Sequence, residues 1–125
     1  MREDLQMARR SLGAVQRLVL REHLSRVEPL LGDSETVQVM APGWWRGYRC
    51  LIVVTASRLL LLRRQLRCST ANEAVIRLRS IGGISVHALP EGGARFRLAV
   101  GLDQEEFSVN GSAVEVERAL RASRT

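Results

Sequence analysis

Lysine is absent from this chain of 125 residues, and cysteine and aromatic residues are scarce. All 19 basic residues are therefore arginine, and the only cysteines are Cys50 and Cys68. Two cysteines are too few for a disulfide framework, and neither has a second cysteine or a histidine at the spacing of metal ligands. The sequence thus predicts neither a disulfide-stabilised scaffold nor a bound metal or other cofactor.

Long hydrophobic runs are also missing. The longest one, Leu51–Leu62, has 12 residues and contains Arg58, whereas a transmembrane helix needs roughly 20 apolar residues. The first ten residues mix acidic, basic and apolar side chains, which is not the pattern of a secretory signal. We therefore expect a cytoplasmic protein, located peripherally at the inner membrane face if it binds lipid.

No arrangement typical of catalysis is found. His23 and His87 each stand alone, without a nearby serine or aspartate that would complete a catalytic group. Gly92-Gly93 is not followed by the spacing of a phosphate-binding loop. With 46% hydrophobic and 26% charged residues, the composition is that of one globular domain. We expect this domain not to be an enzyme.

The acidic residues are distributed unevenly, and this is the most informative feature of the composition. Residues 1–35 and 73–125 contain equal numbers of basic and acidic residues, whereas residues 36–72 contain six arginines and no acid. The whole net charge of +6 therefore lies in one third of the chain. Such asymmetry favours an anionic partner for one surface, and a solvated basic face without a partner is the alternative.

The N-terminal third shows helical periodicity. Leu5, Ala8, Leu12, Val15 and Val19 recur at steps of three and four residues, which places them on one face of an amphipathic helix. Pro29 predicts that this helix ends near Glu28, because the residue before a proline disfavours helical backbone. Gly32-Asp33-Ser34 is the connection, and we place the boundary between the helical segment (1–31) and a β-rich domain (32–125) at its start. The apolar face either covers the β-domain or pairs with a second copy of the chain.

Beyond residue 35 the apolar pattern changes to a period of two, which predicts seven strands. The first ends at Pro42-Gly43, and the central run Leu51–Leu62 forms a hairpin that turns at Thr55-Ala56-Ser57. The other strands are predicted at residues 75–79, 81–87, 95–100 and 105–109, with Arg95 and Arg97 opposite Glu105 and Glu106. Ser112 and Glu115 form a capping-box pattern that begins a helix ending near Ser123, with Val116 and Leu120 facing the core.

Several of these segments resemble the bacterial pleckstrin-homology family. The resemblance covers about residues 30–123, and it rests mainly on the Thr55-x-x-Arg58-Leu59 corner, the strand before it and the single closing helix. It implies a mainly β (α+β) fold: a seven-stranded antiparallel barrel or sandwich with a C-terminal capping helix, here extended by the N-terminal amphipathic helix. It also implies a binding module, since relatives bind lipid headgroups, peptides or other protein domains.

The candidate binding residues combine the basic stretch with an aromatic cluster. Trp44-Trp45-Arg46-Gly47-Tyr48-Arg49 holds three of the five aromatic residues. One interpretation is that a tryptophan covers the open end of a barrel, and the other is that an exposed tryptophan pair anchors at lipid headgroups. We predict that one patch carries partner binding, and it consists of Trp44, Trp45, Arg46, Arg49, Arg63, Arg64 and Arg67.

Three kinds of partner are compatible with this patch. We expect an anionic phospholipid surface first. The alternative is a protein–protein interaction or assembly module that acts through the N-terminal helix and an exposed strand edge. Nucleic acid is a third and weaker option, because tryptophan stacking with arginine also suits single-stranded DNA.

Overall fold

The structure is a computed structural model, and it describes residues 27, 29–32, 35–63, 73–90 and 92–122. Residues 1–26 of the predicted N-terminal helix lie outside the described residues, as do Cys68 and two residues of the predicted patch, Arg64 and Arg67.

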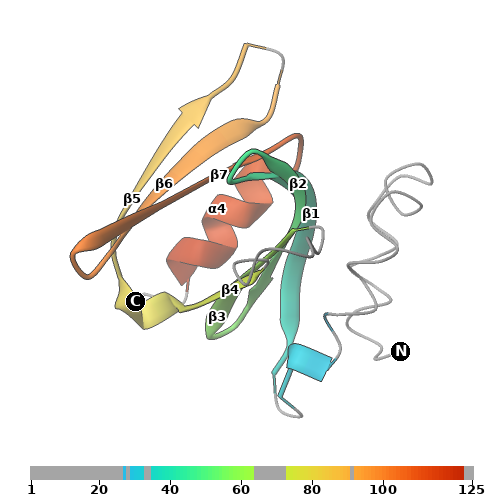
Figure 1. Ribbon diagram of the computed structural model, residues 1–125, viewed down its shortest axis with the longest axis vertical. Helices are drawn as coiled ribbons and strands as arrows, with labels where there is room; N and C mark the ends of the chain where they lie inside the picture. The colour runs from blue at the N-terminus through green and yellow to red at the C-terminus, as the bar shows by residue number, and fades with distance from the viewer. Residues whose placement is uncertain (1–26, 28, 33–34, 64–72, 91, 123–125) are drawn as a thin grey trace.

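The described part of the chain contains seven strands and a C-terminal helix, and a few residues with helical backbone precede the first strand (Figure 1). In chain order they are β1 (Val37–Trp45), β2 (Tyr48–Thr55), β3 (Arg58–Arg63), β4 (Glu73–Arg77), a 3-10 turn (Leu78–Ser80), β5 (Ile81–Ala88), β6 (Ala94–Val100), β7 (Asp103–Val109) and α4 (Ala113–Ala122). The prediction of seven strands followed by one helix is confirmed.

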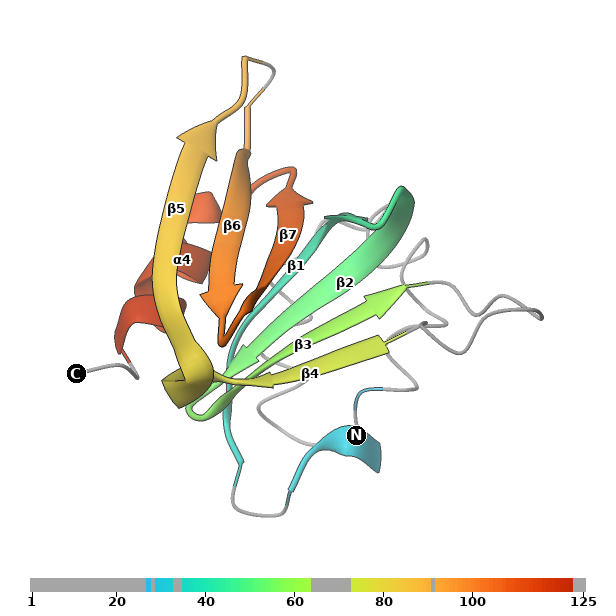
Figure 2. The ribbon, with the colours of Figure 1, turned by 60° about the vertical axis from the view of Figure 1, so that its left-hand side comes forward.

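All paired strands are antiparallel, in the order β4-β3-β2-β1-β7-β6-β5. The sheet bends where β1 passes from β2 to β7, so that β1–β4 and β5–β7 form two diverging halves (Figure 2). Only three residue pairs, from Gly43↔Val109 to Trp45↔Phe107, join β1 to β7. The two halves are therefore connected by a short ladder.

The inner core lies between the two halves and α4. It includes the stacked rings of Phe96 and Phe107, whose centroids are 5.1 Å apart, and Val116 and Leu120 of α4. Both α4 residues are fully buried, as their spacing of four predicts. The helix thus fills the opening between the halves of the sheet.

A second apolar cluster lies on the opposite face of β1–β3. It consists of Val27, Val37, Met40, Leu51, Val53, Leu60 and Leu62, with Leu30 and Leu31 packed against it. Because both faces of β2 and β3 are buried, their sequence is a continuous apolar run instead of an alternating one. The last residues of the predicted N-terminal helix that the structure describes therefore cover the sheet.

The first strand does not end at Pro42-Gly43, as the sequence predicts, but continues to Trp45. The Pro42 carbonyl accepts the N–H of Asn110 at 3.3 Å, so it points to the β7 side of the strand. Because the N–H and C=O of one strand residue point to the same side, the missing N–H of Pro42 would also point there, beyond the last residue of β7. Pro42 is therefore tolerated, since the ladder with β2 loses no hydrogen bond.

Three smaller predictions differ from the structure. Pro29 and Leu30 have helical backbone, so the predicted end near Glu28 is too early; the fixed φ of proline, about −65°, is itself compatible with helical backbone. Residues 78–80 form a 3-10 turn instead of the end of a strand. Ser112 has φ of 58°, whereas an N-cap residue takes extended backbone, so the capping-box geometry is not adopted.

No helix within the described ranges is long and apolar enough to cross a membrane. Among the same residues, no three of the histidine, cysteine, aspartate and glutamate side chains come together as metal ligands would. Cys50 is buried in β2, and burial raises the pKa of its thiol to about 12.

Candidate functional site

The aromatic cluster forms the tip of the β1–β2 hairpin. Trp44 and Trp45 end β1, Arg46 and Gly47 form a two-residue turn, and Tyr48 begins β2 opposite Trp45. Both turn residues have positive φ, 53° for Arg46 and 82° for Gly47, which is the requirement of a type I′ hairpin turn. Asparagine is common at the first position of such a turn, so an arginine there gives no recognisable turn signal in the sequence.

The two tryptophans do not form an exposed pair. Because successive residues of a strand point to opposite faces, Trp45 faces the core and is 1% exposed, whereas Trp44 is 43% exposed. The indole Nε1 of Trp45 donates to Glu105 Oε1 at 2.6 Å. Trp45 therefore closes the end of the barrel, and only Trp44 is available to a partner.

Arginines surround these rings. The Arg46 guanidinium lies 4.6 Å from the centroid of the Trp45 ring and 3.5 Å from Glu105 Oε2. Arg63 lies 5.0 Å from the Tyr48 ring and 5.9 Å from the Trp45 ring. Aromatic faces attract a guanidinium. This arrangement therefore explains why Arg63, a charged residue at the end of β3, can be buried to the point of being only 7% exposed.

The opposite face of the hairpin carries a second pair. Arg49 lies 5.7 Å from the centroid of the Trp44 ring, and the two residues are direct cross-strand neighbours. Arg49 is exposed and forms no ion pair with any residue that the structure describes. It is thus the tip arginine whose charge is most available to a partner.

Five of the seven predicted patch residues are described, and all five lie at this tip: Trp44, Trp45, Arg46, Arg49 and Arg63. Two further residues were missed. Tyr48 is 44% exposed and contributes a third ring, and its position within the aromatic cluster of the sequence could have identified it. Glu105 of β7 balances part of the positive charge of the tip. No sequence pattern places Glu105 there, because it lies 60 residues beyond Trp45 in the chain.

An open cavity of about 410 Å³ adjoins the tip. Its lining includes Trp44, Arg46, Arg95, Glu105, Glu106 and Ser108. Glu106 pairs with Arg95 at 3.3 Å and with Arg97 at 3.7 Å, which confirms part of the predicted strand contact. Because two glutamates balance the two arginines of the lining, the cavity itself is not a strongly cationic site.

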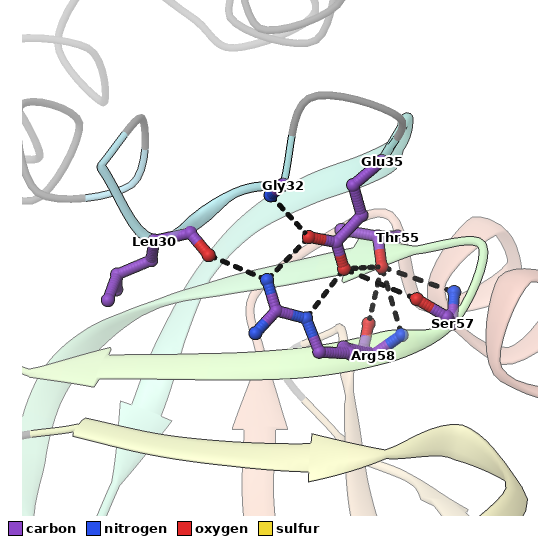
Figure 3. Close-up of polar contacts among 6 residues, drawn as sticks. All are labelled: Leu30, Gly32, Glu35, Thr55, Ser57 and Arg58. Atoms are coloured by element: carbon purple, nitrogen blue, oxygen red, sulfur yellow. Dashed lines mark hydrogen bonds and ion pairs between the residues drawn. The ribbon is translucent and has the colours of Figure 1, made fainter.

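A polar cluster at the other end of β2 holds the β2–β3 corner (Figure 3). The hydroxyl of Thr55 accepts the backbone N–H groups of Ser57 at 3.2 Å and Arg58 at 2.9 Å, and it donates to Glu35 Oε2 at 2.9 Å. The Arg58 guanidinium binds both oxygens of Glu35 and also the Leu30 carbonyl at 2.6 Å. The corner predicted from Thr55 and Arg58 therefore depends on Glu35, the acid that precedes the acid-free stretch.

The charge of Glu35 is stabilised by these contacts. Its pKa is lowered from 4.5 to about 2, mainly by the hydrogen bonds from Arg58, against the opposing effect of burial. The backbone N–H of Gly32, which donates at 2.9 Å, and the Thr55 hydroxyl add to the effect. The same ion pair raises the pKa of Arg58. This cluster is a structural clamp that joins Leu30, Gly32 and Glu35 to the β2–β3 corner.

Comparisons with known proteins give structural relatives only. No protein-family model matches the chain, and no curated protein matches it significantly. Among solved structures, it resembles a DUF1696 family protein with a pleckstrin-homology domain from Shewanella loihica PV-4, with a TM-score of 0.58 and 17% identity over 85% of this chain and 93% of that one. A pleckstrin-homology domain from Shewanella amazonensis SB2B gives a TM-score of 0.56 and 18% identity over 84% and 97%.

A third neighbour is the hSac2 domain from the human phosphoinositide phosphatase Sac2, with a TM-score of 0.55 and 11% identity over 90% of this chain and 85% of that one. At these identities the likeness establishes the fold. The resemblance drawn from the Thr55-x-x-Arg58-Leu59 corner is thereby confirmed for the architecture: the chain has the pleckstrin-homology fold, and bacterial pleckstrin-homology domains are among the structures most like it.

Proposed function

We propose that this domain is a non-catalytic interaction module that binds an anionic phospholipid surface through the tip of the β1–β2 hairpin. The observation that carries the proposal is the pairing of exposed rings with arginines at that tip: Arg49 with Trp44, and Arg63 with Tyr48. Amphipathic aromatic rings are favoured at the lipid headgroup layer, and arginine is attracted to anionic lipid. Arg64 and Arg67, which follow β3 in the sequence, complete the proposed patch.

Charge sets the expected strength of binding. The described tip carries three arginines, Arg46, Arg49 and Arg63, against one glutamate, Glu105. At about 1 kcal/mol per basic residue near an anionic leaflet, a net of two charges supplies about 2 kcal/mol. Binding should therefore be weak and sensitive to salt, and the balanced charges of the adjoining cavity favour attraction to a charged surface over recognition of one headgroup.

Vesicle co-sedimentation tests this proposal. The full chain should sediment with phosphatidylcholine vesicles that contain phosphatidylglycerol, more strongly as the phosphatidylglycerol share rises and less strongly at high salt. Arg49→Glu changes the tip by two charge units, so its affinity should fall about 30-fold, by the same electrostatic increment of about 1 kcal/mol per charge.

Arg79→Glu is the matched control, because it makes the same charge change in an exposed residue of the 3-10 turn. That turn adjoins the β2–β3 corner, where Leu78 N donates to Ser57 O, and so lies at the opposite end of β2 from the tip. This variant should retain most of the binding. Equal losses in Arg49→Glu and Arg79→Glu would show that only net charge matters, and binding to neutral vesicles as strong as to anionic ones would refute the proposal.

A further inference from the structure

The outer face of the sheet carries a row of cross-strand neighbours that continues beyond the hairpin tip. The strand register places Trp44 opposite Arg49 of β2 and opposite Ser108 of β7. Ser108 is in turn opposite Arg95 of β6, and Arg95 is opposite His87 of β5. Residues directly opposite one another on paired strands share a face of the sheet. Five strands therefore contribute to one outer row: Arg49, Trp44, Ser108, Arg95 and His87.

The outer row is open to solvent. Its members alternate along their strands with Trp45, Phe96 and Phe107, which belong to the inner core. Successive residues of a strand point to opposite faces, so the row lies on the outside of the fold. All of its residues are exposed except Ser108, which is half-buried.

Trp44 lies at the crest of this outer face. The sheet bends where β1 passes from β2 to β7, and the inner core fills the inside of the bend (Figure 2). Trp44 pairs with strands on both sides of that joint, so its ring lies on the outside of the bend. Arg49 lies next to it on one side, and Arg95 lies beyond Ser108 on the other. A flat surface that touches this crest therefore meets the indole ring first and the arginines next.

The outer face has a net positive charge. Arg97 shares this face with Arg95, since the two are two residues apart in β6. Both pair with one acid, Glu106, at 3.3 Å from Arg95 and 3.7 Å from Arg97. Among the strand residues that the structure describes, Arg49, Arg95 and Arg97 therefore face outward here against Glu106, which leaves a net of about two positive charges.

The end of the fold toward which the hairpin points is more acidic. β1 and β7 are antiparallel, so the hairpin points toward the start of β7, where Glu105 already binds Arg46. Asp103 and Glu105 alternate with Gln104 and Glu106, and they therefore point away from the outer face. A domain that stood on this end would bring Asp103 toward an anionic membrane, whereas a domain that lies on its outer face turns Asp103 and Glu105 away from it.

We infer that the domain lies side-on at the membrane, with Trp44 at the headgroup layer and Arg49, Arg95 and Arg97 facing anionic lipid. This inference rests on the proposed function and deepens it, because it extends the contact from the hairpin tip across the outer face of β7 and β6. Trp44 and Arg95 are two strand spacings apart, or about 10 Å. Arginine and indole are thus close enough to act on the same patch of headgroups.

Two adjacent residues of β7 test this orientation by a gain of binding. Gln104 and Asp103 are both exposed and point to opposite faces. Gln104→Arg adds one positive charge to the outer face, and Asp103→Asn removes one negative charge from the other face. In co-sedimentation of the full chain with phosphatidylcholine vesicles that contain phosphatidylglycerol, Gln104→Arg should raise the affinity about fivefold. Asp103→Asn should change it less than twofold, and a gain of affinity cannot result from loss of folding.

A reversal of charge gives an independent check. Arg97→Glu changes the outer face by two charge units and should lower the affinity for the same vesicles at least tenfold. Arg118→Glu is the matched control, because it makes the same change in an exposed residue of α4, which packs on the inner side of the sheet. This variant should retain the affinity within threefold. Circular dichroism of both variants verifies that they remain folded.

The outcomes separate this inference from the proposed function. Equal gains in Gln104→Arg and Asp103→Asn, or equal losses in Arg97→Glu and Arg118→Glu, would overturn the side-on orientation. The proposed function would then still stand if Arg49→Glu weakens binding. A larger gain in Asp103→Asn than in Gln104→Arg would show that the domain stands on its end instead. Failure of the unmodified chain to bind anionic vesicles would overturn both.

Discussion

At the scale of single residues, Glu35 has the clearest energetic role. Its side chain is 9% exposed and binds Arg58, Thr55 and Gly32. Because its pKa in the folded protein, about 2, is below its ordinary value of 4.5, the carboxylate stabilises the fold at pH values above about 4.5. This stabilisation is lost as pH falls from 4.5 toward 2, and it amounts to on the order of 2 to 3 kcal/mol.

Glu35→Gln measures this contribution. The variant should unfold at lower urea concentration at pH 7, and its deficit relative to the unmodified protein should shrink as pH falls toward 2. The other carboxylates titrate in both proteins, so the difference between the two isolates Glu35. A deficit that stays constant from pH 7 to pH 2 would contradict the role of the ionised Glu35.

At the scale of elements, the short ladder between β1 and β7 is the joint of the fold. Gly43 begins it, and a Cβ at this position would lie 1.9 Å from the carbonyl oxygen of Ser108 and 2.6 Å from Ile52. Gly43→Ala must therefore separate the strands, and we expect it to lower the free energy of unfolding by about 3 kcal/mol, as overpacking does.

Gly82→Ala is the control for this change, since its Cβ would come no closer than 3.8 Å to Ala99. Urea unfolding should give nearly the same midpoint for Gly82→Ala as for the unmodified protein. If Gly43→Ala is equally well tolerated, the close approach of β1 and β7 at Gly43 is not what joins the two halves.

At the scale of the whole molecule, period-two patterns predicted most of the strands, the continuous apolar run Leu51–Leu62 predicted β2 and β3, and the Thr55-x-x-Arg58 corner predicted the architecture. The extent of β1 was not predictable from local rules, because Pro42 is acceptable only where β7 ends and Asn110 donates to it. Similarly, the double burial of β2 depends on Val27, Leu30 and Leu31, which precede the sheet in the chain. Both features arise from contacts between segments distant in sequence.

The candidate site was predictable in composition but not in orientation. The sequence places two tryptophans and two arginines next to one another, and only the strand alternation decides that Trp45 is buried and Trp44 is exposed. Arg63 likewise lies between Trp45 and Tyr48 because β3 ends beside the tip. Variants of Trp45 or Arg63 would therefore disturb the fold as well as any binding, and Trp44 and Arg49 are the residues with which to test function.

Fluorescence quenching of Trp44 by vesicles tests the central proposal most directly. Phosphatidylglycerol vesicles with lipids brominated in the upper acyl chain should quench the emission of the full chain, because the exposed Trp44 ring enters the headgroup layer. Trp44→Phe should abolish this quenching, since the remaining indole, Trp45, is buried. We therefore expect quenching that weakens at high salt and disappears in Trp44→Phe. Emission that is unchanged by brominated anionic vesicles at low salt would contradict it.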